Sequence, residues 1–227
     1  MNVGGHRTRK TDDGGIAVIG LGRFGSRLAG SLAHLNQDVL AIERNLERVQ
    51  HWSTQLDRVV QADSTDESAL RQLGVADFRR VVVAIGASVE ASILTVLALT
   101  ELDIPQIWAR ATSEQHAKIL DSVGAHHVIF PEAETGERVA HLIVSKMLDF
   151  VEFGDDFAIA KVRIPKTLVG RRLRDLSPAD RYGVMVVGAK PPGERFRYAG
   201  PDTVLQPESV LIVEGSIDQL QRFATPG

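Results

Sequence analysis

Cysteine is absent from the 227 residues of this chain, and aromatic residues make up only 5% of them. Without a thiol the chain cannot form disulfides, use a cysteine nucleophile or hold zinc or iron–sulfur clusters through thiolates, and a reducing cytoplasm is the expected location. Neither sign of charge dominates, since 26 basic residues stand against 29 acidic ones. This balance argues against nucleic acid or an anionic membrane surface as the main partner.

The sequence also lacks an apolar stretch near the ~20 residues that a membrane-spanning helix needs. Residues 1–14 carry charged, glycine and threonine residues without an apolar segment, so we expect a disordered tail and not a signal peptide. The seven histidines show no metal-ligand spacing, and no H-E-x-x-H, G-x-S-x-G or P-loop sequence is present. These absences argue against the common metallopeptidases, serine hydrolases and P-loop nucleotidases.

Apolar runs alternate with helical spacings from Ile16 to Phe130. The runs, which are typical of strands buried on both faces of a sheet, lie at 16–19, 38–42, 58–61, 80–84, 107–110 and 127–130. Helical patterns between them cover 24–35, 46–52, 67–73, 89–102 and 114–123, with Asn45 as an N-cap and Gly124 as a C-cap glycine. This alternation predicts a doubly wound parallel sheet of the Rossmann type.

The pattern changes after this alternation. An apolar stripe predicts one helix over 135–150, followed by short strands at 157–164, 184–189, 195–198 and 209–213 and helices near 171–176 and 217–223. We therefore expect a small α+β domain with antiparallel strands. The predicted layout is a tail (1–14), a nucleotide-binding domain (15–133), a crossover helix with linker (134–154) and the small domain (155–227).

The sequence Gly20-Leu-Gly22-Arg-Phe-Gly25 follows the first predicted strand and opens the first predicted helix. In this setting G-x-G-x-x-G indicates a dinucleotide site: Gly20 allows the tight turn, Gly22 lets the backbone approach a pyrophosphate, and Gly25 permits close helix–strand packing. The helix N-terminus, with Arg23 and Phe24, then faces the phosphates. The alternative is a Rossmann fold that has lost its ligand.

An acidic residue ends the second predicted strand. Glu43 stands about 20 residues after the glycine turn, where a carboxylate accepts hydrogen bonds from the adenosine ribose. The same charge repels a 2′-phosphate, so adenosine without that group is expected. Arg44 is a complication, because an arginine at this place can favour the 2′-phosphate of NADP.

Further candidate residues lie in the glycine turn and at the ends of later strands. Arg23 either contacts phosphates, which suits a nucleoside triphosphate, or forms a surface salt bridge. Asp63 and Ser64 either touch the adenine edge or cap the next helix. Arg110 ends the fifth strand at the ligand-binding edge of the sheet. Glu132 pairs with one of these arginines, holds a divalent cation shared with phosphates, or is only a helix N-terminal acid.

With these residues in place, the sequence resembles the cytosolic regulatory subunits of Trk/Ktr-type potassium uptake systems, the KtrA group of RCK (regulator of K+ conductance) proteins. The similarity extends over nearly the whole chain from Ile16. Its specific parts are Val-Ile-Gly-Leu-Gly-Arg-Phe-Gly at 18–25, Val-Ala-Ile-Gly-Ala at 83–87, Ala-Ser-Ile-Leu-Thr at 91–95, Glu-Leu-Asp-Ile-Pro at 101–105, Val-Gly-Ala-His at 123–126 and Ile-Phe-Pro-Glu at 129–132. The last 70 residues resemble the RCK_C (TrkA-C) domain in Arg-Tyr-Gly-Val at 181–184 and Val-Leu-Ile-Val at 210–213.

The resemblance implies an RCK_N (TrkA-N) Rossmann domain followed by RCK_C, in homodimers that form an octameric ring. The ring would lie at the inner face of the membrane, beneath an integral-membrane subunit that translocates potassium. ATP and ADP, or NAD(H), would compete for the glycine turn. By the same resemblance, Arg23 matches an arginine at the γ-phosphate across the dimer. Glu43 matches the ribose acid, and Glu132 matches an acid at the inter-subunit ATP site, which can bind Mg²⁺ or Ca²⁺.

Two further inferences concern other ligands and functions. Some relatives bind cyclic di-AMP through an arginine where this chain has Ala179, a departure that argues against that ligand here. A nicotinamide-dependent oxidoreductase is one alternative function, but the small domain has no histidine and its lysines form no recognisable catalytic pattern. A free-standing nucleotide or redox sensor is the other alternative. The expected function is thus ligand-controlled gating without catalysis.

Overall fold

The computed structural model describes residues 14–154 and 156–225, and the chain divides into two units after Pro131. Of the tail expected at residues 1–14, all but Gly14 lies outside the described residues. The elements of the first unit are β1 (Ile16–Ile19), α1 (Arg23–His34), β2 (Val39–Glu43), α2 (Leu46–Trp52), β3 (Val59–Gln61), α3 (Glu67–Gln72), a 3₁₀ turn (Val75–Asp77), β4 (Arg80–Val83), α4 (Val89–Glu101), β5 (Gln106–Arg110), α5 (Glu114–Ser122) and β6 (His127–Ile129).

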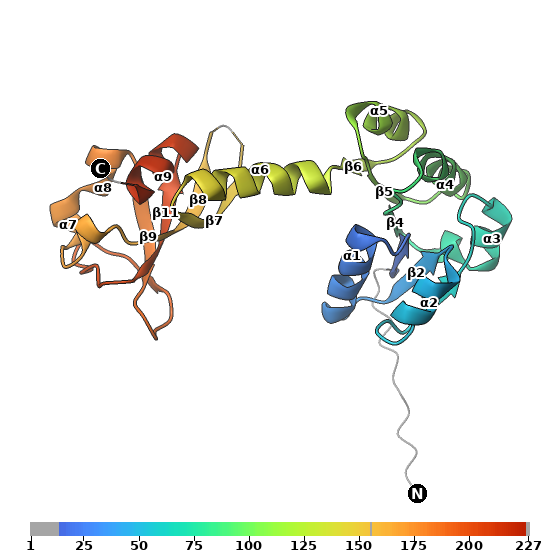
Figure 1. Cartoon of the computed structure of the whole chain (residues 1–227), viewed down its shortest axis with the longest axis horizontal. Helices are drawn as coiled ribbons and strands as arrows, with labels where there is room; N and C mark the ends of the chain where they lie inside the picture. Colours follow the sequence, from blue (N-terminus) through green and yellow to red (C-terminus); the bar gives the residue numbers. More distant parts are fainter. Residues whose placement is uncertain (1–13, 155, 226–227) are drawn as a thin grey trace, which may run out of the picture. The chain divides into compact units, whose positions relative to one another are not determined.

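The strands of the first unit form one parallel sheet in the order β3-β2-β1-β4-β5-β6. Both faces of the sheet are covered. On one face Val18 and Ala41 pack with residues of α1 and α2, and on the other Ile19 and Ile42 pack with residues of α3, α4 and α5. The elements can be followed by their labels in Figure 1. The predicted doubly wound Rossmann sheet is confirmed, with its switch point between β1 and β4.

Side-chain caps fix where the helices of this unit begin. Asn45 caps α2 as predicted, and the prediction that Asp63 or Ser64 caps the next helix is wrong, because Asp66 does so. Capping satisfies backbone N–H groups that have no partner inside the helix. The capping side chains, each of which accepts from a backbone N–H in the first turn, are Asn45 (α2), Asp66 (α3), Ser88 (α4) and Ser113 (α5).

The second unit begins with a helix and continues as an antiparallel sheet in the order β10-β9-β11-β8-β7. This confirms the predicted small α+β domain. Its core gathers the inward-facing residues of these strands and one face of α9, with Leu211, Val213 and Leu220 fully buried. The elements are α6 (Pro131–Val144), β7 (Met147–Glu152), β8 (Ala158–Arg163), a 3₁₀ turn (Lys166–Leu168), α7 (Leu173–Leu176), α8 (Pro178–Tyr182), β9 (Met185–Lys190), β10 (Arg197–Tyr198), β11 (Val210–Gly215) and α9 (Ile217–Ala224).

The single helix predicted over 135–150 is wrong in its second half. Helix α6 starts earlier and ends at Val144, and Met147–Glu152 form strand β7. The hydroxyl of Ser145 donates to the carbonyl of His141 and accepts from the amide of Met147. The hydrogen bond from Met147 takes the place of a backbone hydrogen bond that would continue the helix. Met147 and Phe150 are then buried in the core of the second unit. The predicted linker therefore contains a strand of the second sheet.

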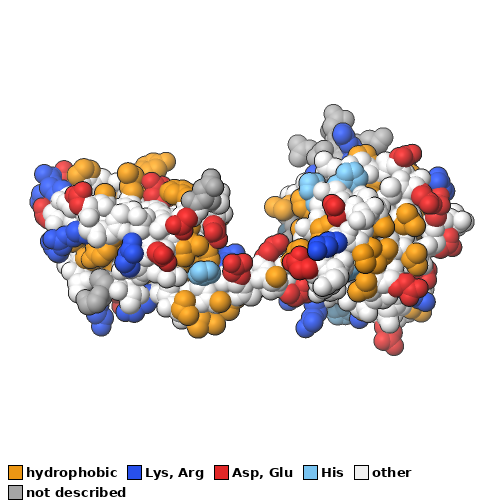
Figure 2. Space-filling model, turned by 90° about the horizontal axis from the view of Figure 1, so that it is seen from above, with side chains coloured by type: hydrophobic (Ala, Val, Ile, Leu, Met, Phe, Trp, Pro, Cys, Tyr) orange, Lys and Arg blue, Asp and Glu red, His pale blue; other side chains and the backbone are white. Residues whose placement is uncertain are grey.

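The surface of both units is mixed in charge. On the face that Figure 2 shows, acidic and basic side chains are interspersed over each unit. Among the described residues, no helix combines the length and apolar character required to cross a bilayer. Helix α4 buries Val96 and Leu99 but leaves Leu94 and Leu97 each 43% exposed.

Candidate functional site

The glycine turn joins β1 to α1 at the carboxyl edge of the parallel sheet. Gly20 has a φ of +94°, a left-handed conformation that side chains rarely adopt, and its amide donates to the carbonyl of Ile42. A Cβ on Gly25 would overlap the carbonyl oxygen of Gly20 and lie 2.8 Å from the Cβ of Ala84. Helix α1 therefore approaches the sheet as closely as its backbone allows.

The N-terminus of α1 differs from those of the other long helices of this unit. Its N-cap is Gly22, which has no side chain to offer, and its first turn holds no acid. A Cβ built on Gly22 would meet nothing within 4 Å. The N-cap position is thus open, and it lies at the positive end of the helix dipole without a capping side chain. This is the arrangement that binds phosphate groups.

Glu43 lies beside this turn and holds it in place. Its side chain is only 7% exposed, and its two oxygens accept hydrogen bonds from the amides of Leu21 at 2.7 Å and Asn45 at 2.9 Å. The guanidinium of Arg48 lies 3.7 Å from the same carboxylate. A carboxylate offers about four lone-pair sites, so two remain available for further hydrogen-bond donors.

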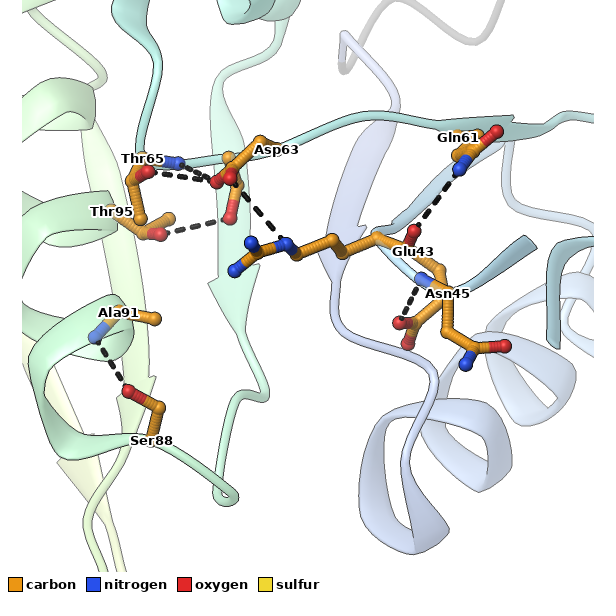
Figure 3. A network of polar contacts seen from close by, with 10 residues as sticks. Glu43, Asn45, Gln61, Asp63, Thr65, Ser88, Ala91 and Thr95 are labelled. Carbon is orange, nitrogen blue, oxygen red and sulfur yellow. Dashed lines mark hydrogen bonds and ion pairs between the residues drawn. The ribbon is translucent and has the colours of Figure 1, made fainter. Parts of the chain in front are cut away.

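A polar network continues along the sheet edge from Arg44 to α4 (Figure 3). Asp63 accepts from the amide and hydroxyl of Thr65 at 3.1 and 2.7 Å and pairs with Arg44 at 3.5 Å. The bonds from Thr65 hold the pKa of Asp63 below its ordinary value. Ser64 is buried and bonded to Thr95 of α4 at 2.8 Å. Arg44 is therefore engaged within the edge network through Asp63, while Ser64 joins the strand end to α4.

Arg110, the last residue of β5, lies over the loop that follows β4. A Cβ on Gly86 would overlap the guanidinium of Arg110, whose carbon would be 2.6 Å away. His116 of α5 lies close enough to this arginine to feel its charge. It is 2% exposed, its Nδ1 accepts from the amide of Thr112 at 3.3 Å, and its Nε2 has no hydrogen-bond partner among the described residues.

Burial, together with the positive charge of Arg110, lowers the pKa of His116 from its ordinary 6.5. At acid pH the unfolded chain therefore protonates this histidine more readily than the folded chain does. We expect the free energy of unfolding to fall as the pH drops below about 6.5, by at most about 1.4 kcal/mol per pH unit. His116→Asn, which keeps an acceptor for Thr112, should flatten this dependence in urea titrations between pH 5 and 8.

The matched control for this prediction is His34→Asn, which removes an exposed histidine from the last turn of α1. An equal change of slope in both variants would show that the buried ring is not the source of the pH dependence.

The remaining predicted residues belong to helices α1 and α6. Arg23 is exposed in the first turn of α1, while Phe24 packs against the core beneath that helix. Glu132 is exposed in the first turn of α6 and belongs to the second unit. No group of three or more metal-ligating side chains occurs among the described residues. Within the first unit the structure thus assembles the glycine turn, Glu43, Asp63 and Arg110 along one sheet edge.

Sequence reasoning gave no role in the site to three residues of this edge, although two of them, Gly86 and Thr95, lie in segments that carry the family resemblance. Gly86 lies three residues after the end of β4, and a glycine before the serine cap of α4 was the available signal. Thr95 and His116 gave none, because a hydroxyl or imidazole inside an apolar helical pattern does not reveal its partner. Their contacts depend on the packing of α4 and α5 against the sheet edge.

Both units match known protein families. The TrkA-N domain matches residues 16–131 and the TrkA-C domain matches residues 157–225. The Ktr system potassium uptake protein A of Bacillus subtilis (strain 168) is 33% identical over 213 residues, which is 93% of this chain and 96% of that protein. Protein C of the same organism's Ktr system is 36% identical over 209 residues, covering 92% and 95%. The protein A of Vibrio alginolyticus is 34% identical over 212 residues, covering 93% and 96%.

Solved structures agree on the fold. The crystal structure of the GsuK RCK domain matches 96% of this chain and 49% of its own, with a TM-score of 0.65 and 21% identity. The GsuK channel bound to NAD matches 94% and 38%, with a TM-score of 0.52 and 23% identity. GsuK bound to ADP matches 59% and 35%, with a TM-score of 0.50 and 27% identity. This chain spans less than half of each of these longer chains.

Proposed function

The chain belongs to the TrkA-N/TrkA-C family of potassium uptake regulators, and from that premise we propose that it is the cytosolic gating subunit of a Ktr/Trk-type system. It would bind ATP or ADP, with NAD(H) as the alternative, in the glycine turn, and so control potassium flux through an integral-membrane subunit. The observation that carries the proposal is the N-terminus of α1, which is closely packed at Gly25 and open at Gly22. Solved structures of the similar GsuK protein with NAD and with ADP support the ligand class.

In this proposal the residues of the sheet edge contact different parts of the nucleotide. The amides at the start of α1 bind the phosphates, and the two remaining acceptor sites on Glu43 bind the ribose. Asp63 and Ser64 border the adenine, and Arg110 lies beyond the phosphates over Gly86. The carboxylate of Glu43 also disfavours a 2′-phosphate, so NADP is not the proposed ligand.

Discrimination between ATP and ADP needs a contact that only the triphosphate makes. A ligand shifts a conformational equilibrium only by its differential affinity for the two states. Moving a gate from 1:99 to 99:1 requires about 5.5 kcal/mol. If the subunits form the proposed octameric ring of dimers, each of eight sites supplies roughly 0.7 kcal/mol, which lies below the usual coupling range of about 1–3 kcal/mol. One charge-assisted contact from Arg23 to the terminal phosphate is enough.

We expect Arg23→Gln to weaken ATP binding about tenfold while changing ADP binding by less than about twofold, because a charged contact to one extra phosphate is lost. Isothermal titration calorimetry measures both constants. Arg27→Gln is the matched control, since Arg27 is exposed one turn further along the same helix. Equal losses for ATP and ADP, or no loss, would remove Arg23 from the discrimination.

A divalent cation fits the proposal as a companion of the phosphates. Glu132 is a single exposed carboxylate, so it can give Mg²⁺ or Ca²⁺ one or two oxygens, with phosphate oxygens and water completing the shell. We also propose that the subunit acts without catalysis and lies at the cytoplasmic side of the membrane, against its potassium-translocating partner. Cyclic di-AMP is not proposed as a ligand, because Ala179 replaces the arginine that relatives use.

Nucleotide binding and flux together test the whole proposal. The purified chain should bind ATP and ADP in calorimetry. Vesicles that contain the membrane subunit should change their potassium flux when ATP replaces ADP in the presence of the chain. A chain with no affinity for ATP, ADP or NADH would end the proposal. Nucleotide binding without an effect on flux would instead favour a free-standing sensor. Consumption of bound NADH with a substrate would favour an oxidoreductase.

A further inference from the structure

A pocket of about 400 Å³ opens in the second unit beside β7, β8 and the end of α9, far in sequence from the glycine turn. This volume falls within the range of about 300–1,000 Å³ that is usual for small-molecule sites. The lining residues within the described chain are Lys146, Leu148, Arg163, Ile164, Pro165, Lys166, Thr167 and Ala224.

The floor of the pocket is apolar and buried. Ile164, Pro165 and Ala224 are buried parts of the second unit. Leu148 lies at an irregularity of β7, where Met147 pairs with Val162 but Asp149 already pairs with Lys161. This extra residue bends the strand and turns a side chain out of the regular alternation. Leu148 is consequently 41% exposed, although it belongs to the sheet.

The rim of the pocket is cationic. Lys146, Arg163 and Lys166 are exposed, and none of them forms an ion pair within the part of the chain that the structure describes. No acid occurs among the eight lining residues, and Thr167 adds a hydroxyl. Three positive charges thus surround one pocket in a chain whose net charge is −3. Like charges this close repel one another unless an anion lies between them.

A purely structural role accounts for only part of this cluster. The carbonyl end of α9 favours nearby cations, and Ala224 of that helix lines the pocket. However, Arg222 already occupies the last turn of α9. A role at the end of α9 also does not explain why the floor of the pocket is apolar or why Leu148 is exposed.

We propose that this pocket binds a small amphiphilic anion. A phosphate or carboxylate group is held between Lys146, Arg163 and Lys166, and its apolar body lies on Leu148 and Ile164. The site is independent of the proposed nucleotide site, because it belongs entirely to the second unit. Its ligand would therefore act as a second input to the same subunit.

The test uses the full chain in the presence of saturating ADP, so that the glycine turn is occupied. Hexyl phosphate is titrated by calorimetry, with hexanol as the uncharged probe and inorganic phosphate as the probe without an apolar body. We expect hexyl phosphate to bind with one site per chain and at least about tenfold more tightly than either control, since only it satisfies both rim and floor. Raising the salt concentration should weaken the binding.

Variants locate the site. Arg163→Gln/Lys166→Gln should weaken hexyl phosphate binding by about tenfold or more, and Lys146→Gln alone should weaken it less. Lys190→Gln/Arg195→Gln removes two exposed charges elsewhere in the same unit and should leave binding unchanged. No binding, equal affinity for hexanol, or equal losses in the two double variants would overturn the proposal. If the first double variant lost thermal stability while the parent chain bound no hexyl phosphate, these cations would have only a structural role beside the carbonyl end of α9.

Two sources can supply this chemistry, and vesicles separate them. Sedimentation with phosphatidylcholine vesicles that contain phosphatidic acid presents the phosphate group in a membrane, and pure phosphatidylcholine vesicles are the control. Binding that requires phosphatidic acid and is lost in Arg163→Gln/Lys166→Gln would assign the pocket to lipid. Binding of soluble hexyl phosphate alone would assign it to a metabolite. Failure of both probes would show that the pocket is not an anion site.

Discussion

Gly25→Ala should unfold the first unit at a markedly lower temperature than the parent chain and abolish its nucleotide binding. The added methyl group would overlap the carbonyl oxygen of Gly20 and press on Ala84, and a backbone carbonyl in a tight turn cannot move aside cheaply. We expect a loss of about 3 kcal/mol, at the upper end of overpacked cores. In a chain of this size this corresponds to about 6–12 °C in Tm. Calorimetric unfolding and ADP titration measure the two effects.

Gly30→Ala on the same helix is the matched control. A Cβ at this position would meet nothing within 4 Å, so the change only improves helix propensity. We expect it to stabilise the unit by about 0.5–1 kcal/mol and to leave ADP binding unchanged. If the two alanines had the same effect, close packing at Gly25 would not be what shapes the turn.

The first unit could be predicted almost entirely from the sequence. Strands β1 and β2 are buried on both faces, so each is a nearly continuous apolar run, and the glycine turn, Asn45 cap and Gly124 C-cap use residues whose conformational reasons are local. Local chemistry of this kind is visible in the sequence. The ligand-binding edge followed from the alternation of strands and helices, since ligands meet parallel sheets at their carboxyl edge.

The second unit resisted prediction where the stabilising contacts are not local. Met147 and Phe150 continue the helical stripe of α6, and only the antiparallel pairing with β8 places them in a strand. The stripe was thus real in the sequence, but tertiary pairing overrode it. The cationic pocket was invisible for the same reason. The lining residues are far apart in the sequence, since Lys146 lies 17 residues before Arg163 and Ala224 lies near the C-terminal end of the sequence.

The candidate site shows both kinds of residue. The positions of Glu43 and Arg110 at strand ends followed from the pattern, but what these side chains contact did not. Sequence reasoning treated Glu43 only as a ribose acceptor, whereas the structure shows that it also binds the amides of Leu21 and Asn45. A residue that shapes the turn and, under the proposed function, also meets the ligand would couple the stability of the site to its occupancy.

That coupling leads to the second large effect, which we expect for Glu43→Gln. A carboxylate accepts at both oxygens, but an amide has one acceptor, so either Leu21 or Asn45 would present its N–H to an NH₂ group. A buried N–H without a partner costs about 1–3 kcal/mol. The ribose loses a charged acceptor as well, so ADP should bind at least about tenfold more weakly.

Urea unfolding and ADP calorimetry on the same preparations measure both consequences, with Glu47→Gln as the matched control. Glu47 is an exposed acid in the first turn of α2, four residues away, and its loss should cost only about 0.3–1 kcal/mol without affecting ADP. Because bound ADP stabilises only the folded chain, the parent should gain more stability from a given ADP concentration than Glu43→Gln does. A variant with normal ADP affinity but reduced stability would confine Glu43 to the turn, and the ribose would then need another acceptor.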